Sequence, residues 1–403
     1  MRLHRNLVFA VIDALNMIFN QGEYADKVVE KVLRRDKRWG SRDRGFIAET
    51  TYEIVRYKRL YQEIAEVKTP FSRADLFRII GVWITLRGIP LPEWEQFKNT
   101  PARRIKGKFD ELAKIRKFRE AVPDWLDELG VQSLGKERWS RELAALNQQA
   151  AVVLRVNRLK TDLDALQKEL SALKIPTTRL KGYEDALLLE QRTDVFKTPL
   201  FKKGWFEVQD ASSQLVAPFL QVEPGQLVVD ACAGAGGKSL HLAALMENKG
   251  QLLALDIYDY KLKQLKLRAR RNGVHNLESR LIQNTKVIKR LNKRADRVLI
   301  DAPCTGMGVL RRNPDAKWKL NPEFLERVTA IQRQILEDYS KMVKPGGKIV
   351  YATCSILPRE NEEQVQEFLK KDSGSGFVLE EEKHCSPADD GFDGFYMARL
   401  RRK

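Results

Sequence analysis

Apolar residues recur at intervals of three and four through the first third of the chain. One series runs through Leu7, Ala10, Val11, Ala14, Leu15 and Ile18, and a second through Ile47, Thr51, Ile54, Val55 and Tyr61. This spacing places the apolar side chains on one face of a helix. We therefore expect residues 1–145 to form a helical domain.

Beyond this helical part the pattern changes. Residues 146–203 contain a β-like run at 151–159, a helical stretch at 161–173 and apolar residues near 186–190, which together predict a small mixed α/β subdomain. From 204 to 403, short apolar strands alternate with helices. This alternation is typical of an α/β domain with a doubly wound, mostly parallel sheet.

The composition adds a strong positive charge to this picture. The 403 residues include 72 Lys and Arg against 54 Asp and Glu, a net charge of +18. A polyanion is the natural partner of such a chain, because each cation laid against a phosphate releases a condensed counterion. General solubility is the alternative explanation. Because no apolar run reaches the roughly 18–20 residues that span a bilayer, we expect no membrane segment.

The four cysteines, at positions 232, 304, 354 and 385, are far apart in the sequence. No pair has the close spacing of a zinc site, and a chain of this size does not need a disulfide framework. We therefore expect reduced cysteines, no metal and a cytoplasmic location.

Basic residues are dense in three segments of the helical part, with Trp39 and Tyr57 among them: 33–45, 56–59 and 102–119. Runs of charge are common on solvated helix faces, and they also occur on surfaces that contact RNA. The sequence leaves both interpretations open.

A glycine-rich turn follows the first strand of the predicted sheet. The segment LVVDACAGAGGKS (227–239) reads as a strand, a tight turn and a helix start, an arrangement that lets the backbone approach a ligand closely. It is not a phosphate-binding P-loop, because Cys232 stands where that motif requires glycine. Asp256 ends the next strand, where a carboxylate suits a ribose diol. The turn alone fits either NAD or S-adenosylmethionine.

Two cysteines follow later strands of the same sheet. They lie in VLIDAPCTGMG (298–308) and in IVYATCSILPRENEE (349–363). Ligands of open α/β sheets sit at the carboxyl ends of the strands, so Asp301, Cys304 and Cys354 are expected to converge near the glycine turn. Such a convergence is what a covalent mechanism needs.

These motifs, DACAGAGGK, DAPCTG and TCS, together with GWFEVQDASSQ upstream and PRENE downstream, resemble the RsmB/Nop2/Sun family of RNA cytosine-5 methyltransferases. The resemblance covers roughly residues 150–403 and implies a Rossmann-like class I methyltransferase domain over 204–403. The N-terminal part resembles, more loosely, the NusB-like RNA-binding domain of the bacterial members.

The resemblance also implies roles for single residues. S-adenosylmethionine would be bound by Cys232, Ala233, Gly234, Ala235, Gly236, Gly237 and Lys238, by Asp256 and by Asp301. Cys354 would be the nucleophile, and Cys304 would assist product release. Two positions depart from the family pattern: Ala235 stands where a proline is usual, and Asn284 where an acid near the adenine is usual. The second departure leaves the role of Asn284 as a ligand open.

The chemistry of these residue types agrees with the resemblance. Carbon 5 of cytosine is a poor nucleophile, and a thiolate added at carbon 6 turns the ring into an enamine that attacks a methyl sulfonium. Cysteine suits this step because its thiolate forms at an accessible pKa. Asp301 is the candidate acid near ring atom N3. Lys238 either steadies the thiolate or the cytosine, or faces solvent at the helix start.

The segment RRNPDAKWK (311–319) follows the Cys304 motif and is the strongest candidate for RNA contact. Cations around an aromatic residue suit RNA binding, because the cations can contact the phosphate backbone and the aromatic ring can stack on a base. A target base must leave its helix to react. The candidates are Arg311, Arg312, Lys317 and Trp318, with Arg155 and Arg158 in the small subdomain. Trp318 fits a protein core equally well.

The sequence therefore predicts a monomeric RNA cytosine-5 methyltransferase, with rRNA as the expected substrate. Three alternatives stay open: a tRNA methyltransferase, a catalytically inactive RNA-binding ribosome-assembly factor, and an NAD-dependent oxidoreductase on the same type of sheet.

Overall fold

The computed structural model describes residues 3–403 and divides into two compact units. The first comprises Met1–Gln148 together with Leu310–Pro322, and the second comprises Gln149–Val309 and Glu323–Lys403. Residues 310–322, which follow the Cys304 motif directly, thus belong to the helical unit. The sequence pattern did not indicate that these residues pack with the N-terminal helices.

The first unit is helical, as the apolar periodicity predicted. Its helices are α1(Arg5–Phe19), α2(Ala25–Leu33), α3(Ser41–Arg56), α4(Lys58–Ala65), α5(Arg73–Leu86), α6(Ala102–Leu112), α7(Arg116–Arg119), α8(Asp124–Leu134), α9(Lys136–Leu146) and α16(Ala316–Lys319), with a 3₁₀ turn η1(Glu95–Phe97). The predicted apolar face of α1 is buried in the core of this unit. At α5, Ser72 and Asp75 form a reciprocal cap that satisfies two backbone N–H groups.

The second unit begins with a small antiparallel sheet, in the order β2-β3-β1-β4. Its elements are β1(Val153–Val156), α10(Leu163–Ala172), β2(Thr177–Arg179), β3(Ala186–Leu189), η2(Val195–Lys197), α11(Pro199–Lys202) and β4(Phe206–Val208). β4 pairs with β1, so this sheet extends past residue 203, where the sequence pattern placed its end. The strand was missed because three residues are too few for a periodic signal.

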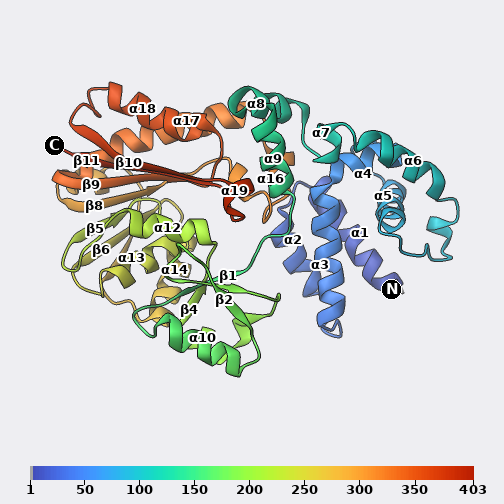
Figure 1. Cartoon of the computed structure of the whole chain (residues 1–403), viewed down its shortest axis with the longest axis horizontal. Helices are drawn as coiled ribbons and strands as arrows, with labels where there is room; N and C mark the ends of the chain where they lie inside the picture. The colour runs from blue at the N-terminus through green and yellow to red at the C-terminus, as the bar shows by residue number, and fades with distance from the viewer. Residues whose placement is uncertain (1–2) are drawn as a thin grey trace. The chain divides into compact units, whose positions relative to one another are not determined.

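The larger sheet has seven strands in the order β10-β11-β9-β8-β5-β6-β7 (Figure 1). The five from β9 to β7 are parallel, and β10 and β11 are antiparallel. The elements are α12(Ala211–Phe219), β5(Leu227–Asp230), α13(Gly237–Leu245), β6(Gln251–Asp256), α14(Asp259–Asn272), β7(Leu277–Leu281), α15(Lys286–Arg290), β8(Ala295–Asp301), η3(Met307–Val309), α17(Pro322–Tyr339), η4(Ser340–Met342), β9(Val343–Thr353), η5(Pro358–Glu360), α18(Glu362–Lys370), β10(Phe377–Cys385), α19(Pro387–Asp390) and β11(Phe395–Arg402).

Helices cover both faces of this sheet, which is why its strands read as continuous apolar runs. On one face Val229 and Val298 pack with side chains of α15, α17 and α18. On the other, Val228 and Leu299 pack with α12 and α13. The predicted doubly wound α/β fold is confirmed. Its consequence is that the carboxyl ends of β5, β6, β8 and β9 all lie at one edge.

Among the described residues, no helix is long and apolar enough to cross a membrane.

Candidate active site

The two cysteines of the strand-end motifs lie against each other. Cys304 follows β8, Cys354 follows β9, and these strands are parallel neighbours. Their Sγ atoms are 3.2 Å apart, within hydrogen-bonding range for sulfur. The hydrogen bond to Cys354 and burial raise the pKa of Cys304 well above its ordinary value. The Cys304 thiol is therefore hard to ionise while this hydrogen bond is in place.

A buried carboxylate joins the two loops that carry these cysteines. Glu360, fully buried at the end of η5, accepts hydrogen bonds from the backbone N–H of Thr305 (2.8 Å) and from its hydroxyl (2.5 Å). It also accepts from the hydroxyl of Ser355 and from Nε2 of Gln332 (3.1 Å). Thr305 adjoins Cys304 and Ser355 adjoins Cys354, so one side chain sets the position of both thiols.

Asn361, the next residue, strengthens the same connection. Its Nδ2 donates to the carbonyl of Ser355 (3.0 Å), and its Oδ1 lies at the hydroxyl of Thr353. The backbone N–H of Gly308 donates directly to the carbonyl of Cys354 (2.9 Å). Sequence reasoning assigned no role to Glu360 and Asn361, although both lie in the PRENE motif on which the resemblance rested.

A cavity of about 300 Å³ opens at the same edge of the sheet. Its lining includes Cys232, Ala233, Gly234, Ala235, Gly237, Lys238 and Asp301, seven of the residues predicted to bind the cofactor. Ser213, which the sequence placed in the structure that shapes the cofactor pocket, also lines it. Asp230, Arg268, Val208 and Gln209 line it as well, and the sequence did not assign them to the cofactor. The cavity therefore lies where the glycine turn was expected to receive a ligand.

The glycines of this turn have two different functions. Gly236 has φ +88°, and a Cβ there would lie 2.7 Å from Cγ of Leu265, so this position packs the turn against α14. Gly234 also has a positive φ (+55°), but neither Gly234 nor Gly237 has an atom within 4 Å of its would-be Cβ. These two glycines leave open space that side chains would fill. The backbone is thus free to approach a ligand.

Two arginines hold the turn by its carbonyl groups. Arg155 of β1 donates to the carbonyl of Gly237 (2.7 Å), and Arg268 of α14 donates to that of Ala235 (2.7 Å). Glu207 of β4 pairs with Arg268 (3.0 Å) and with Arg271. Burial alone would raise the pKa of Glu207, but these partners and Asn272 lower it. The small sheet thereby supports the cavity wall.

Arg155 was predicted to face RNA, and that prediction is wrong. Its side chain is only 3% exposed because it reaches Gly237 and Gln209 inside the unit. Burial lowers its pKa to about 10, which still leaves it charged at neutral pH.

Lys238 and Asp301 form an ion pair in the cavity wall, with 2.7 Å between Nζ and Oδ2. Burial disfavours the charged lysine, but Asp301 and the nearby Cys354 and Asp230 raise its pKa above the ordinary value. Lys238 therefore does not face solvent. It is a permanent cation between the cavity and the thiol pair.

Asp230, at the end of β5, is a buried acid in the cavity wall. One carboxylate oxygen is 2.6 Å from the hydroxyl of Ser239, and the other has no hydrogen-bond partner among the described residues. Burial, opposed by Ser239 and reinforced by Asp301, raises the pKa of Asp230 to about 7. The site thus contains a carboxyl group that titrates near neutrality.

Gly236, Asp256 and Asn284, the remaining three predicted cofactor ligands, do not line the cavity. Asp256 ends β6 as expected, and its two oxygens accept the backbone N–H groups of Gly234 and Tyr258, each at 2.8 Å. Each oxygen keeps a further lone pair for a ribose hydroxyl. Asn284 is exposed and its Oδ1 accepts from the backbone of Lys286 (3.0 Å). Contact of any of the three with the cofactor stays a prediction.

The segment 311–319 is held inside the helical unit, so its expected RNA contacts are largely wrong. Arg311 is 5% exposed and Lys317 is 2% exposed. Lys317 donates to the carbonyl of Glu120 and to Oδ1 of Asn147 (3.3 Å each), and burial lowers its pKa to about 7. Trp318 packs on the helical core and donates from Nε1 to the carbonyl of Val55 (2.6 Å).

Arg312 and Arg158 are the RNA candidates that the structure leaves accessible. Arg312 is half-buried. The side chain of Arg158 is 44% exposed and pairs with Asp185 and with Glu184 (3.2 Å). RNA contact by these two arginines stays a prediction.

Comparison with known protein families gives two matches. Residues 217–401 match the model described as "16S rRNA methyltransferase RsmB/F". Residues 122–196 match the model described as "Methyltr_RsmF/B-like, ferredoxin-like domain".

Similar proteins cover nearly the whole chain. A Bacillus subtilis protein named "Probable ribosomal RNA small subunit methyltransferase B" is 33% identical over 97% of this chain and 98% of its own length. A Synechocystis protein with the same name is 31% identical over 91% of this chain and 89% of its own length. A solved methyltransferase homologue from Pyrococcus horikoshii is 26% identical with a TM-score of 0.64, covering 72% of this chain and 98% of that one.

Proposed function

The chain belongs to the RsmB/RsmF family of 16S rRNA methyltransferases, and from that premise we propose that it methylates carbon 5 of a cytosine in 16S rRNA. It is an RNA methyltransferase that uses S-adenosylmethionine, as the whole family does. This membership excludes the NAD-dependent alternative. The observation that carries the finer proposal is the pair of thiols 3.2 Å apart, beside a cavity of the right kind for the cofactor.

The residues present fit S-adenosylmethionine, which supplies an electrophilic methyl group when bound. The open space at Gly234 and Gly237 lets the backbone lie against the ligand. Asp256 would bind the ribose hydroxyls, and Asp301 would lie between the cofactor and the cytosine. The arginines behind the turn keep this wall rigid before the ligand arrives.

Cys354 is the proposed nucleophile. Its thiolate adds to carbon 6 of cytosine, and the displaced electron pair makes carbon 5 nucleophilic toward the methyl group. Asp301 was expected to be the acid near N3, but it is ion-paired with Lys238 and the cation is the donor of the pair. Lys238 therefore donates a hydrogen bond at N3, where negative charge develops, and the Asp301 carboxylate accepts from the 4-amino group. The cation also stabilises the Cys354 thiolate.

Cys304 is the proposed base for product release. While Cys354 is a thiolate, its hydrogen bond is the first cause of the raised Cys304 pKa. Once the sulfur of Cys354 has bonded to carbon 6, that cause is removed and Cys304 ionises more easily. Its thiolate then takes the carbon 5 proton, the electron pair reforms the 5,6 double bond, and Cys354 leaves as a thiolate.

Two variants test these roles. Cys354→Ala should abolish methyl transfer to unmodified 16S rRNA while leaving S-adenosylmethionine affinity unchanged, because the thiol pair lies outside the cavity lining. Cys304→Ala should accumulate a covalent RNA adduct, visible as a gel shift that resists denaturation. Retained activity of the first variant, or no adduct with the second, contradicts the assigned role.

The substrate is tested separately. Bisulfite sequencing of RNA from a strain lacking the protein should show one lost methylcytosine in 16S rRNA. A loss confined to tRNA would favour the tRNA alternative, and no loss together with no activity in vitro would favour the inactive assembly factor.

A further inference from the structure

More than half of the net charge of the chain lies in one short part of the methyltransferase unit. Residues 257–294 contain twelve lysines and arginines against two acids, a net charge of +10 out of +18. This part consists of α14, the edge strand β7 and α15. None of the three basic runs singled out from the sequence lies in it.

The outer face of α14 combines cations with exposed apolar side chains. Leu262, Leu265 and Ala269 are buried, whereas the opposite face is exposed and carries Tyr260, Lys263, Lys266, Leu267 and Arg270 at intervals of three and four. Tyr260 is 60% exposed and Leu267 is 67% exposed. A face that served solubility alone would not carry these two side chains between its cations.

α15 packs on the other face of the sheet, since Ile288 lies with Leu253 and Leu255, whereas Leu262 and Leu265 of α14 lie with Ala254. The cations of α15 therefore do not continue the face of α14. We call the α14 basic surface the set of exposed residues Lys263, Lys266 and Arg270. Over residues 3–403, Lys263 has an ion-pair partner, Asp259 (2.7 Å), and Lys266 and Arg270 have none. The charge of Lys266 and Arg270 is therefore available to a partner molecule.

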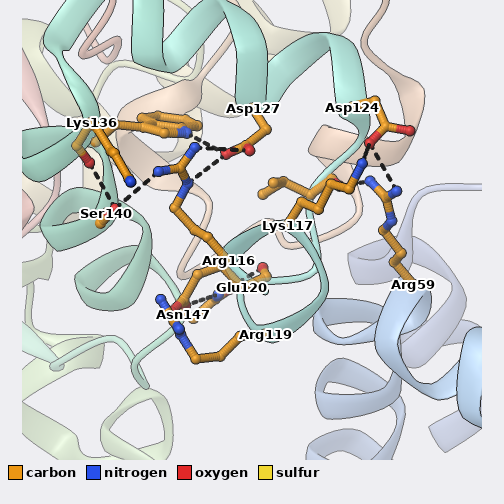
Figure 2. Close-up of polar contacts among 12 residues, drawn as sticks. Arg59, Arg116, Lys117, Arg119, Glu120, Asp124, Asp127, Lys136, Ser140 and Asn147 are labelled. Atoms are coloured by element: carbon orange, nitrogen blue, oxygen red, sulfur yellow. Dashed lines mark hydrogen bonds and ion pairs between the residues drawn. The ribbon is translucent and has the colours of Figure 1, made fainter. Parts of the chain in front are cut away.

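The basic runs of the helical unit behave differently (Figure 2). Arg116 pairs with Asp127 through two hydrogen bonds of 2.9 and 3.0 Å, and Lys117 and Arg59 both pair with Asp124. Arg104 and Lys108 likewise share Glu66. Carboxylates from other helices thus neutralise much of this charge, which weakens its attraction for a polyanion.

We propose that the α14 basic surface binds the phosphate backbone of the RNA substrate outside the reacting nucleotide, with Tyr260 and Leu267 packing against bases or ribose. This rests on the proposed function, since it assumes that RNA is the substrate. α14 starts three residues after Asp256, at the edge that holds the cavity, and runs away from it. An RNA strand on this face therefore leads away from the reacting cytosine and contributes affinity rather than chemistry.

The test is the triple variant Lys263→Gln/Lys266→Gln/Arg270→Gln. RNA affinity is measured against a 16S rRNA fragment by fluorescence anisotropy over a range of KCl concentrations. Each phosphate contact contributes roughly 0.7–0.9 to the slope of log K against log salt, so the slope should fall by about 2–3. The Kd at 0.1 M salt should rise at least ~10-fold, with kcat at saturating RNA and S-adenosylmethionine affinity unchanged.

A matched control removes the same charge elsewhere. Lys168, Lys174 and Lys181 are exposed on the small subdomain, and Lys168 lies between the acids Asp164 and Glu169. Lys168→Gln/Lys174→Gln/Lys181→Gln should leave the salt slope within error of the wild type. Equal losses in both triple variants would show an effect of net charge and overturn the proposal.

A second variant tests the apolar contacts. Tyr260→Ser/Leu267→Ser should raise the Kd about 10-fold without changing the salt slope, because stacking involves no counterion release. Unchanged affinity would restrict the surface to phosphate contacts and overturn the role of Tyr260 and Leu267. Competition by poly-glutamate as effective as that by RNA would assign the surface to an acidic protein instead.

These outcomes are separable from failure of the proposed function. If the wild-type protein methylates 16S rRNA and the triple variant binds this RNA as tightly as the wild type, only the proposed role of the surface is overturned. If the wild-type protein transfers no methyl group, but the triple variant binds RNA more weakly and with a lower salt slope than the wild type, only the enzymatic proposal is overturned.

Discussion

Glu360 gives the sharpest test of how the fold places the two reactive thiols. Its carboxylate accepts four hydrogen bonds, two from Thr305, one from Ser355 and one from Gln332. Glu360→Gln keeps the size of the side chain but replaces one acceptor oxygen by an NH₂ group. The hydroxyls of Thr305 and Ser355 then have to turn and accept instead of donate.

The magnitude follows from these bonds. A buried hydrogen bond to a charged group stabilises by about 1.5–3 kcal/mol and a neutral one by about 0.5–1.5 kcal/mol, so losing the charge costs roughly 1 kcal/mol per bond. Over two to four bonds, the free energy of unfolding should fall by about 2–4 kcal/mol. A shift of about 1 Å in the position of reacting groups can lower the reaction rate about 100-fold, so kcat should fall on the order of 100-fold.

Three measurements are needed: urea unfolding, single-turnover methyl transfer, and the rate at which a mild oxidant links Cys304 to Cys354, followed by mass spectrometry. Glu363→Gln is the matched control, since Glu363 is an exposed acid directly after the PRENE motif. We expect the two thiols to be linked more slowly in Glu360→Gln and not in Glu363→Gln. The S-adenosylmethionine affinity of Glu360→Gln should be unchanged. A variant that loses stability but keeps the wild-type rates of methylation and thiol linkage would refute the idea that Glu360 positions the thiols.

Three further predictions concern the cavity and the segment after the Cys304 motif. Because burial raises the Asp230 pKa to about 7, the folded protein keeps a proton that the unfolded chain loses above about pH 4, so stability falls as pH rises from about 4 to 7. Asp230→Asn should remove the part of this loss that falls between pH 5 and pH 8, roughly 3 kcal/mol, in urea unfolding of the cofactor-free protein at these two pH values, and an unchanged pH slope would contradict it. Gly236→Ala should lower the free energy of unfolding more than Gly234→Ala, because only the first substitution meets Leu265, whereas Gly234→Ala should lower S-adenosylmethionine affinity more, because its methyl group occupies the open space beside the ligand; urea unfolding and calorimetric titration compare the two. Trp318→Phe should lower the free energy of unfolding by about 1–2 kcal/mol through the lost bond to Val55, with RNA affinity unchanged, and a large loss of RNA binding by the folded variant would restore the stacking interpretation.

The position of the active site could be predicted from the sequence because it depends on local order. The strand, glycine turn and helix of 227–239 follow one another directly, and Cys304 and Cys354 each follow a strand. In a parallel sheet all such strand ends lie at one edge, so the motifs had to meet once the alternation of strands and helices was recognised. The helical N-terminal part followed equally from its period.

The partners of these residues depended on contacts between distant segments. Glu360 shows in the sequence only as one acid among several, and its role depends on Thr305, 55 residues away. The function of Arg155 likewise depends on Gly237, 82 residues away. Such pairings produce no local pattern.

Charge was the property that the sequence by itself described least well. The sequence determined the net charge of +18 and the positions of the basic segments. It does not show whether a distant carboxylate neutralises a given cation. The tertiary structure brings Asp124 and Asp127 to the basic residues of α7, buries Lys317, and leaves Lys266 and Arg270 without an ion-pair partner among residues 3–403. The physical reason is that hydrophobic period is a property of one segment, whereas burial and ion pairing are properties of two segments that only the fold brings together.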